Sequence, residues 1–376
     1  MSLAHNAAAA WRPSHDGVDS DGWLRSHVQL GLEEFLNRRA NQDVPAGLDP
    51  TLVGELCALA LGGGKRIRPT FAWWGWRAAA GPATGSAAQL TIRVLIALEL
   101  LQCCALVHDD VMDRSATRRG RTASHVAFAE QHRACGWAGD DVQFGDSVAV
   151  LIGDLALAWA DDAIVGAGLD GEALARVWEP WRAMRTEMIA GQYLDLLAVA
   201  RREESLAETM RVARLKTAAY TVERPLHLGA ALAGAQPVLI DALRAFGRDI
   251  GVAFQLRDDL LGVFGDEHVT GKPVGDDLRE GKRTPLMAIA LERAATTGRR
   301  DAAHLLRAIL DGGDVTPGLV DEIRALLHDL GAVEAVEERI TELAGRALSA
   351  LQHVDMPAAA RSHLLRLAAK ATTRRR

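Results

Sequence analysis

Cysteine is scarce in this chain, and the placement of the few cysteines gives no sign of a disulfide framework. Four of the 376 residues are cysteines, with no CxxC spacing and no paired arrangement: Cys57, Cys103, Cys104 and Cys135. Disulfide-stabilised secreted domains have regularly spaced, paired cysteines, which this chain lacks. Because two of the cysteines lie in an apolar helical run, we expect buried, reduced thiols in a cytoplasmic protein.

The sequence also lacks a long uncharged apolar run and an excess of basic residues. A membrane-spanning helix needs about 20 apolar residues; no such run free of charge is present, so we expect no membrane span. The net charge of −6 argues against non-specific binding to nucleic acid. The first residues lack the basic-then-apolar order of a signal peptide. We expect a disordered leader over residues 1–20 and one domain over residues 21–376.

Helical periodicity is what the sequence has in quantity. Apolar residues recur with helical spacing nearly everywhere, without convincing alternation of period two, and 49% of the residues are hydrophobic. This pattern predicts an all-α fold, a single-domain bundle of long helices. Pro225 is expected to kink or break its segment. Capping residues, glycines and prolines predict one helix from Pro50 to Gly62 and a second that ends at Gly81. Further helices are expected over 86–112, 146–166, 171–198, 205–223, 238–264, 284–296, 301–310, 318–330, 332–351 and 358–370.

An acidic cluster follows the long apolar helix, in the sequence DDVMDRSATRRG. Residues four apart share a helix face, so Asp109 and Asp113 stack one turn apart, with Asp110 beside them. Hard oxygen ligands at this spacing suit Mg²⁺, which usually shares its shell with substrate phosphate. A solvated helix end is the simpler alternative, but the helix dipole disfavours anions at a C-terminus. The forked donors of Arg118 and Arg119, which follow, are suited to phosphate oxygens.

A second acidic pair, Asp258 and Asp259, follows another apolar segment in FQLRDDLLGVFGD. Gly262 stands at the position that corresponds to Asp113, so the repeat is incomplete. One carboxylate pair still binds a metal ion if substrate oxygens complete the shell. An exposed aspartate pair is the alternative for this segment alone, but two such pairs near helix ends in one chain favour metal binding.

Basic residues gather in separate places. The segment GGGKRIRP has Lys65, Arg66 and Arg68 just after a glycine-rich turn, where backbone N–H groups can approach an anion. Its spacing is not that of a Walker A loop, and a helix connection with solvated cations is the alternative. Further candidates are Lys216, Thr217, Lys272 and Lys282. Together, the acidic and basic clusters suit diphosphates held through Mg²⁺ on one side and by Arg and Lys on the other, above an apolar bundle that takes a hydrocarbon tail.

In this order, the motifs resemble those of the trans-prenyl diphosphate synthases, the head-to-tail polyprenyl synthetase family. The matching segments, between Gly62 and Leu286, are GGGKRIRP, DDVMDRSATRRG, GQYLDL, LKTAAY, FQLRDDLLGVFGD and GKPVGDDLREGKRTPL. The resemblance implies an all-α bundle around a deep central cavity, usually as a homodimer. It implies a Mg²⁺-dependent prenyltransferase that condenses isopentenyl diphosphate with an allylic diphosphate.

The resemblance also implies roles for individual residues. Three Mg²⁺ ions would be bound by the two motifs through Asp109, Asp110, Asp113, Asp258 and Asp259. The allylic diphosphate would be contacted by Arg118, Lys216, Gln255 and Lys272. Isopentenyl diphosphate would be contacted by Lys65, Arg68, Arg119 and, in the place of a histidine, Gln102. Thr217 and Lys282 are further substrate-binding candidates. The residues on which catalysis would depend are Asp109, Asp113, Arg118, Lys216 and Asp258.

The expected chemistry is ionisation of the allylic diphosphate, attack by the double bond of isopentenyl diphosphate, and loss of a proton to the released diphosphate. In this family, an aromatic residue shortly before the first motif stops elongation early. Here Cys104 and Ala105 are small, which implies a product longer than farnesyl diphosphate. Geranylgeranyl diphosphate (C20) is the expected product, and Cys104→Phe is expected to shorten it.

Three alternatives stay open. One is a farnesyl or a longer-chain polyprenyl product. Another is a class I terpene cyclase, which shares the DDxxD motif but needs an NDxxSxxxE type of motif that is absent here. A cyclase also needs no second diphosphate site, which Lys65 and Arg68 indicate. The third is a non-catalytic subunit of a heteromeric synthase, for which Gly262 is the argument.

Overall fold

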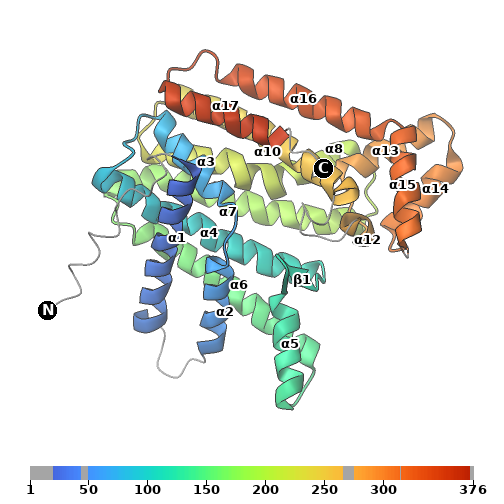
Figure 1. Cartoon of the computed structure of the whole chain (residues 1–376), viewed down its shortest axis with the longest axis horizontal. Helices are drawn as coiled ribbons and strands as arrows, with labels where there is room; N and C mark the ends of the chain where they lie inside the picture. Colours follow the sequence, from blue (N-terminus) through green and yellow to red (C-terminus); the bar gives the residue numbers. More distant parts are fainter. Residues whose placement is uncertain (1–19, 44–49, 266–274, 314, 373–376) are drawn as a thin grey trace. The chain divides into compact units, whose positions relative to one another are not determined.

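The computed structural model describes residues 20–43, 50–265, 275–313 and 315–372, and these are almost entirely helical (Figure 1). One sheet occurs in these ranges, a hairpin of the strands β1 (Thr117–Arg118) and β2 (Arg121–Thr122). The predicted all-α fold is confirmed. The leader expected over residues 1–20 lies outside the described residues, except for its last residue.

The chain divides into two compact units. Unit 1 comprises Met1–Trp73, Gly81–Ala116 and Thr122–Leu174, and unit 2 comprises Trp74–Ala80, Thr117–Arg121 and Ala175–Arg376. The single domain expected over residues 21–376, and the cavity expected from the family resemblance, stay predictions.

Unit 1 is built around one long helix, α4. Its elements are α1 (Asp21–Arg38), the π-helical turn η1 (Arg39–Asp43), α2 (Pro50–Leu61), the first part of α3 (Ile67–Ala78), α4 (Gly85–Met112), α5 (Ser124–Cys135) and α6 (Asp141–Val165). α4 packs against α1, α2, α5 and α6, and its side chains Leu95, Leu98 and Leu101 are fully buried. The first acidic motif therefore follows the core helix of this unit.

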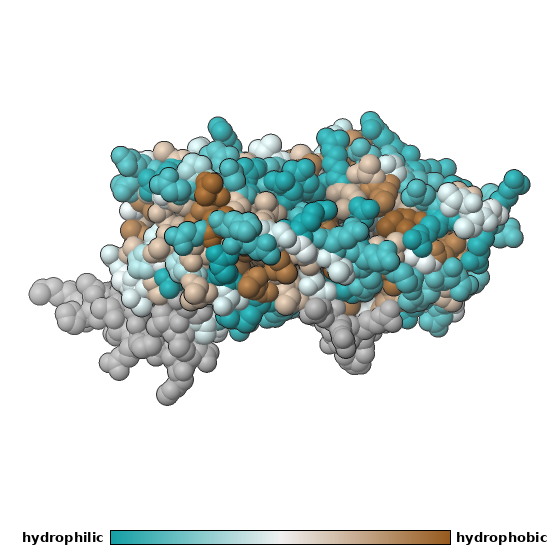
Figure 2. Space-filling model, turned by 90° about the horizontal axis from the view of Figure 1, so that it is seen from above, coloured by the Kyte–Doolittle hydropathy of each residue, from teal (hydrophilic) through white to brown (hydrophobic). Residues whose placement is uncertain are grey.

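By length and composition alone, α4 could cross a membrane, and it is the one such helix in the described part of the chain. However, 72% of its most apolar window is buried inside the structure. A close approach to α6 contributes to this burial: a Cβ added at Gly153 would lie 2.7 Å from Cε1 of His108, so only glycine leaves room for the ring. In the view of Figure 2, hydrophilic residues cover most of the surface and hydrophobic residues show in small patches between them.

Unit 2 is built around α10. Its elements are α7 (Gly171–Ala200, whose first residues belong to unit 1), α8 (Leu206–Val212), the π-helix η2 (Ala213–Glu223), α9 (Arg224–Leu232), α10 (Pro237–Phe264), α12 (Asp276–Arg279), α13 (Pro285–Thr296), α14 (Arg300–Leu310), α15 (Pro317–Asp329), α16 (Ala332–Ala350) and α17 (Ala358–Thr372). α10 packs against η2, α9, α16 and α17, and a large hydrophobic cluster joins it to α13, α14, α15 and α16. A Cβ added at Gly251 would lie 2.7 Å from Cα of Ala218, so glycine permits the close approach of α10 to η2.

Helix limits follow the predicted start and stop signals closely. Side chains cap α1, α6, α13 and α15, and the capping residues are Ser20, Asp140, Thr284 and Thr316. The predicted helix over 205–223 is α8 followed by the π-helix η2. Pro225 does not break the chain's helical path: it is the second residue of α9, which follows the π-helix η2 directly, so the helix type changes just before the proline. The helices α1 and α5 were not predicted.

Candidate active site

The first aspartate-rich motif ends α4 in unit 1. The N–H of Asp113 donates to the carbonyl of Asp109 at 2.8 Å, so the helical turn that joins the two residues is complete. Both are half-buried and share a face, as predicted, whereas Asp110 is only 4% exposed. Burial lowers the pKa of His125 on α5, although the carboxylates of Asp146 and Asp110 oppose this. The carboxylate of Asp110 is therefore buried inside unit 1, where its charge acts on His125, while Asp109 and Asp113 keep part of their surface exposed.

The two predicted phosphate-binding arginines lie in the β1–β2 hairpin. Arg119 and Gly120 form its turn with φ values of 54° and 73°, the left-handed conformations of a type I′ turn. Arg118 is half-buried and Arg119 is exposed. Just before the hairpin, Nη1 of Arg114 lies 2.8 and 2.6 Å from the two carboxylate oxygens of Asp146 on α6. The guanidinium of Arg114 is thus paired with Asp146. The tight turn fixes the backbone of Arg118 and Arg119.

Arg66 holds the glycine-rich segment from the inside. Its guanidinium is 5% exposed and pairs with the buried carboxylate of Glu99 on α4. The same group donates to Oε1 of Gln29 at 2.6 Å and to the carbonyl of Ala60 at 2.9 Å. The positive φ of Arg66, 48°, is the backbone turn that accompanies this inward side chain. A buried ion pair therefore fixes the loop.

Lys65 and Arg68 flank this buried arginine. Lys65 is exposed and Arg68 is half-buried. On α4, Gln102 lies one turn after Glu99 and on the same face. Because Arg66 binds Glu99, the loop is held against the part of α4 that carries Gln102. Unit 1 thus brings three of the four residues predicted for isopentenyl diphosphate into one region.

The second aspartate-rich motif lies near the end of α10 in unit 2. Asp258 is exposed, whereas Asp259 is 5% exposed and accepts a hydrogen bond from Nε2 of Gln255 at 2.7 Å. The other oxygen of Asp259, Oδ2, is buried and has no hydrogen-bond partner among the described residues. Burial raises the pKa of Asp259, and the nearby charges of Asp277 and Asp258 raise it further. A buried oxygen without a donor, beside like charges, fits a place that a cation completes.

The predicted Lys216 and Thr217 lie half-buried in the π-helix η2. Nζ of Lys216 lies 2.6 Å from Oδ2 of Asp195 on α7. One turn earlier on α7, a Cβ added at Gly191 would lie 2.5 Å from Cα of Lys216 and still closer to its N. The segments GQYLDL and LKTAAY therefore work together, since Gly191 admits the backbone of η2 and Asp195 orients the ammonium group.

Of the two remaining lysine candidates, the structure describes only Lys282. Lys272 lies outside the described residues. Nζ of Lys282 lies 2.6 Å from Oε2 of Glu280 and 3.4 Å from Oδ1 of Asp277. Because Asp277 also acts on Asp259, Lys282 belongs to the electrostatic surroundings of the second motif.

The side chains of both motifs are suited to Mg²⁺, although the described residues include no group of three or more His, Cys, Asp or Glu that would hold a metal ion by itself. Mg²⁺ prefers oxygen ligands and is usually bound through one or two carboxylates, with water and substrate phosphate in the rest of its shell. Asp109 with Asp113 in unit 1, and Asp258 with the partnerless oxygen of Asp259 in unit 2, fit this description. These are the residues that would hold the ion.

The two chain-length candidates lie on different faces of α4. Cys104 is 3% exposed, with Sγ 3.8 Å from Nδ1 of His108. Burial, with the carboxylate of Asp154 on α6, raises the pKa of this thiol to about 12, so it is protonated at neutral pH. Ala105 is half-buried and lies four residues before Asp109, on the same face. Of the two, Ala105 is the one that lies in line with Asp109 and Asp113, the aspartates predicted to bind metal.

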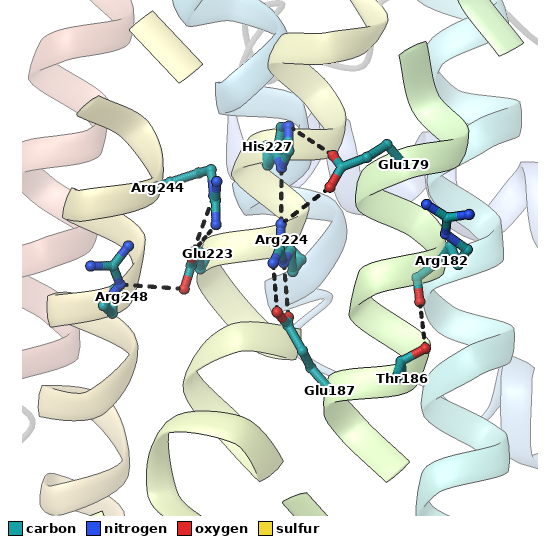
Figure 3. A network of polar contacts seen from close by, with 9 residues as sticks. All are labelled: Glu179, Arg182, Thr186, Glu187, Glu223, Arg224, His227, Arg244 and Arg248. Carbon is teal, nitrogen blue, oxygen red and sulfur yellow. Dashed lines mark hydrogen bonds and ion pairs between the residues drawn. The ribbon is translucent and has the colours of Figure 1, made fainter. Parts of the chain in front are cut away.

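Unit 2 also contains a buried ionic network that the sequence analysis did not identify (Figure 3). Arg224 donates to both oxygens of Glu187 on α7, at 2.8 and 2.5 Å. Its Nη1 lies 3.3 Å from Nδ1 of His227, and Nε2 of His227 lies 3.4 Å from Glu179. The buried Glu223 pairs with two arginines of α10, Arg244 and Arg248. Because its charges are paired with one another, the network ties α7, α9 and α10 together and is no candidate for the active site.

Three residues that hold the site in place were not predicted, and they are Glu99, Asp195 and Asp277. Arg66, which the sequence analysis grouped with Lys65 and Arg68 as a basic residue near an anion, is instead buried against Glu99. Glu99 had a signal in the sequence, since it is a lone acid inside an apolar helix whose partner had to be a buried cation. Asp195 and Asp277 stand inside matching segments, GQYLDL and GKPVGDDLREGKRTPL. Their partners come from other parts of the chain, so spacing along the sequence gave no role to either residue.

An all-α architecture with acidic clusters near the ends of two long helices, and with separate basic residues held by buried partners, defines a class of protein, the isoprenoid synthase type of prenyltransferase. The family model for polyprenyl synthetase matches residues 50–323. The chain belongs to the polyprenyl synthetase family.

Relatives and solved structures agree with this membership. The crystal structure of geranylgeranyl pyrophosphate synthase from Corynebacterium glutamicum, complexed with isoprenyl diphosphate and magnesium, is similar to this chain with a TM-score of 0.88 and 46% identity, covering 94% of this chain and 99% of that one. Geranylfarnesyl diphosphate synthase from Aeropyrum pernix is 31% identical over 84% of this chain and 92% of its own. Octaprenyl diphosphate synthase from Escherichia coli is 31% identical over 88% of this chain and 90% of its own. The protein is therefore a prenyltransferase that makes a prenyl diphosphate.

Proposed function

We propose that the protein performs the Mg²⁺-dependent head-to-tail condensation of isopentenyl diphosphate with an allylic diphosphate, and that its product is geranylgeranyl diphosphate (C20). The main observation behind this proposal is the second motif, where the buried Asp259 has an oxygen without a described partner beside Asp258 and Asp277. The relative from C. glutamicum, at 46% identity, was crystallised with isoprenyl diphosphate and magnesium. A divalent cation held by these aspartates would supply the positive charge that the buried carboxylate and a diphosphate both need.

In this proposal, the two aspartate-rich motifs supply the metal ligands for the allylic diphosphate. Asp109 and Asp113 would hold two metal ions, and Asp258 a third, with Asp110 and Asp259 in support. Bound Mg²⁺ supplies Lewis-acid neutralisation of the charge that develops on the departing diphosphate. Further substrate contacts in the proposal come from Arg118, Lys216, Thr217, Gln255, Lys272 and Lys282.

Lys216 illustrates how the chain prepares the ionisation step. Asp195 holds its ammonium group at 2.6 Å, so the side chain is already oriented before a substrate binds. A positive charge fixed in this way stabilises a developing anion without the cost of reorganisation. Arg118, held by the hairpin backbone, adds charge in the same sense.

Isopentenyl diphosphate would be bound by Lys65, Arg68, Gln102 and Arg119. The amide of Gln102 donates a hydrogen bond but carries no charge, so the three basic residues neutralise this diphosphate. The double bond of isopentenyl diphosphate attacks the allylic cation, and a proton passes to the released diphosphate. Apolar side chains must exclude water during this step, because water would capture the cation.

The assignment of a C20 product rests on the small side chains at the chain-length positions. Ala105 lies on the face of Asp109 and offers no bulky side chain that would stop a growing tail early. The relatives differ in product, as the names geranylfarnesyl and octaprenyl diphosphate synthase show. A longer product is therefore the second candidate, and it is distinguished by the size of the prenyl group that accumulates.

We also propose that the protein is a cytoplasmic homodimer. α6 exposes apolar side chains, Val150 at 43%, Leu151 at 55% and Val165 at 60%, which a second copy of the chain would cover. Light scattering of the purified protein tests this. A monomer at micromolar concentration, or a mass unchanged from the dimer after Leu151→Lys, would contradict the proposed contact.

Replacement of one metal-binding aspartate in each unit tests the activity. Asp109→Asn and Asp258→Asn should each lower kcat by about a hundredfold or more, because each removes a charged group that acts in the transition state. Asp321→Asn is the matched control, since Asp321 is an exposed aspartate of α15 with 79% of its side chain accessible. Full activity of either active-site variant would contradict the proposal. Turnover of an allylic diphosphate without isopentenyl diphosphate would indicate a terpene cyclase instead.

A further inference from the structure

The second aspartate-rich motif lacks the last carboxylate of the first one. Asp109 is followed at i+4 by Asp113, whereas Asp258 is followed at i+4 by Gly262. Residues four apart share a helix face, so a carboxylate is missing from the face of α10 that presents Asp258. From the sequence alone, this departure weakens the second motif.

Another part of unit 2 occupies the space of the missing side chain. A Cβ added at Gly262 would lie 2.5 Å from Cγ of Asp277, and closer still to its Oδ2. The carboxylate of Asp277 therefore lies where the side chain of residue 262 would begin. Asp277 comes from α12, which packs against α10, and only 13% of its side chain is exposed.

The electrostatics of this place indicate that Asp277 acts together with the motif. Asp277 and Asp258 both act on the buried Asp259, whose Oδ2 has no hydrogen-bond partner among the described residues. Lys282 lies 3.4 Å from Oδ1 of Asp277, but it lies closer, at 2.6 Å, to Glu280. Three neighbouring carboxylates, one of them buried, repel each other unless a proton or further positive charge is bound, and a metal ion supplies that charge.

We propose that Asp277 is the third carboxylate of the second motif, delivered from α12 into the space that Gly262 leaves open, and that it positions the motif for a diphosphate-bound Mg²⁺. This inference rests on the proposed function and deepens it. Gly262 is then a requirement of the site rather than a defect, because any side chain at 262 would displace the carboxylate of Asp277. Asp277 is a positioning residue, which supplies charge and fixes the surroundings of Asp258 and Asp259.

Moving the carboxylate between the two positions tests the proposal. Calorimetric titration of the full chain with inorganic diphosphate at a series of Mg²⁺ concentrations measures binding without turnover. Asp277→Ala and the isosteric Asp277→Asn should weaken Mg²⁺-dependent diphosphate binding by about tenfold or more, as loss of a supporting carboxylate does in metal sites. Gly262→Asp alone should also weaken binding, since two carboxylates then compete for one space. The double variant Gly262→Asp with Asp277→Ala should recover affinity to within about threefold of the wild type, because one carboxylate again occupies that space.

Glu280→Gln is the matched control, since it removes the other carboxylate partner of Lys282 without touching the space at Gly262. Its diphosphate affinity should stay within about twofold of the wild type. Wild-type affinity in Asp277→Asn, or a double variant that is folded by circular dichroism yet binds as weakly as Asp277→Ala, would overturn the proposed role of Asp277. A wild-type protein that elongates no prenyl diphosphate but shows Mg²⁺-dependent diphosphate binding lost in Asp277→Asn would overturn the proposed function and leave the role of Asp277 intact.

Discussion

Lys65 and Arg66 are neighbours in the sequence, but their surroundings are opposite. Arg66 is buried against Glu99, Gln29 and the carbonyl of Ala60, whereas Lys65 is exposed. A buried guanidinium needs several such partners, because removal of its only counter-charge costs about 3–5 kcal/mol. One arginine of the basic segment thus holds the loop from the inside. An ion pair also occurs at the first motif, where Arg114 is held by Asp146 before the hairpin begins.

The chain-length hypothesis also belongs to the scale of single residues. Ala105→Phe should shift the main product from geranylgeranyl to farnesyl diphosphate, because the ring would lie on the face of Asp109. For Cys104→Phe, we revise the sequence-based expectation of a shorter product: because Cys104 is 3% exposed and overfilling a packed site costs about 1–3 kcal/mol, this variant should lower the melting temperature. Chromatography of the products and thermal unfolding of both variants distinguish these effects. A Cys104→Phe protein of normal stability that makes a shorter product would show that Cys104 lines the channel.

At the scale of elements, glycines on α7 and α10 set how closely η2 can pack. A Cβ at Gly191 would lie 2.5 Å from Cα of Lys216, and one at Gly251 would lie 2.7 Å from Cα of Ala218. The π-helix therefore lies between two helices that both offer glycine at the contact. π-helical turns recur at functional sites, and here the wide turn contains both residues of the Lys216–Thr217 pair.

Gly191→Ala tests this arrangement. The added methyl group must push η2 away from α7, which should move the ammonium group of Lys216 from Asp195 and lower kcat by about tenfold to a hundredfold. Gly345→Ala is the control, because Gly345 lies in the helix α16 with nothing within 4 Å of its added Cβ. That control should stabilise the protein by about 0.5–1 kcal/mol without loss of activity. Steady-state kinetics and thermal unfolding measure both, and an unchanged kcat in Gly191→Ala would contradict the proposed contact.

The network that joins α7, α9 and α10 predicts a pH dependence of stability. Burial, with the charges of Arg224 and Arg244, lowers the pKa of His227 from 6.5 to about 4. Glu179 lies 3.4 Å from Nε2 and opposes this, but its side chain is 57% exposed and also lies near Arg224, so burial and the guanidinium groups prevail. Below pH 6.5 the unfolded chain takes up a proton at this residue and the folded protein does not.

Stability contributed by the neutral His227 is therefore complete above pH 6.5 and is lost as the pH falls toward 4. A pKa shift of one unit corresponds to about 1.4 kcal/mol. The free energy of unfolding should therefore fall by about 3 kcal/mol over this pH range through His227 alone. Urea unfolding at several pH values measures it, and His227→Gln should remove this part of the slope. Parallel curves for the wild type and the variant would show that His227 is not held neutral.

At the scale of the whole molecule, the sequence was sufficient for the all-α class and the limits of most helices, whereas the roles of the aspartates stay predictions. Periodicity, caps and prolines determine helix limits locally, and α2, α10 and α13 each begin at a proline within one residue of the predicted start. The partners of charged groups could not be predicted, because Arg66–Glu99 and Lys216–Asp195 join residues that are far apart in the chain. The clearest case is Asp277, whose place at Gly262 depends on how α12 packs against α10.

The proposed function requires Mg²⁺ at the aspartate-rich motifs for departure of the allylic diphosphate and addition of isopentenyl diphosphate. The most direct measurement is product analysis by liquid chromatography and mass spectrometry, after incubation of the purified chain with isopentenyl diphosphate, Mg²⁺ and dimethylallyl, geranyl or farnesyl diphosphate. Our account predicts that all three primers are elongated to geranylgeranyl diphosphate, and that chelation of Mg²⁺ stops the reaction. Failure of every primer to be elongated, or elongation that continues unchanged without a divalent metal ion, would contradict it.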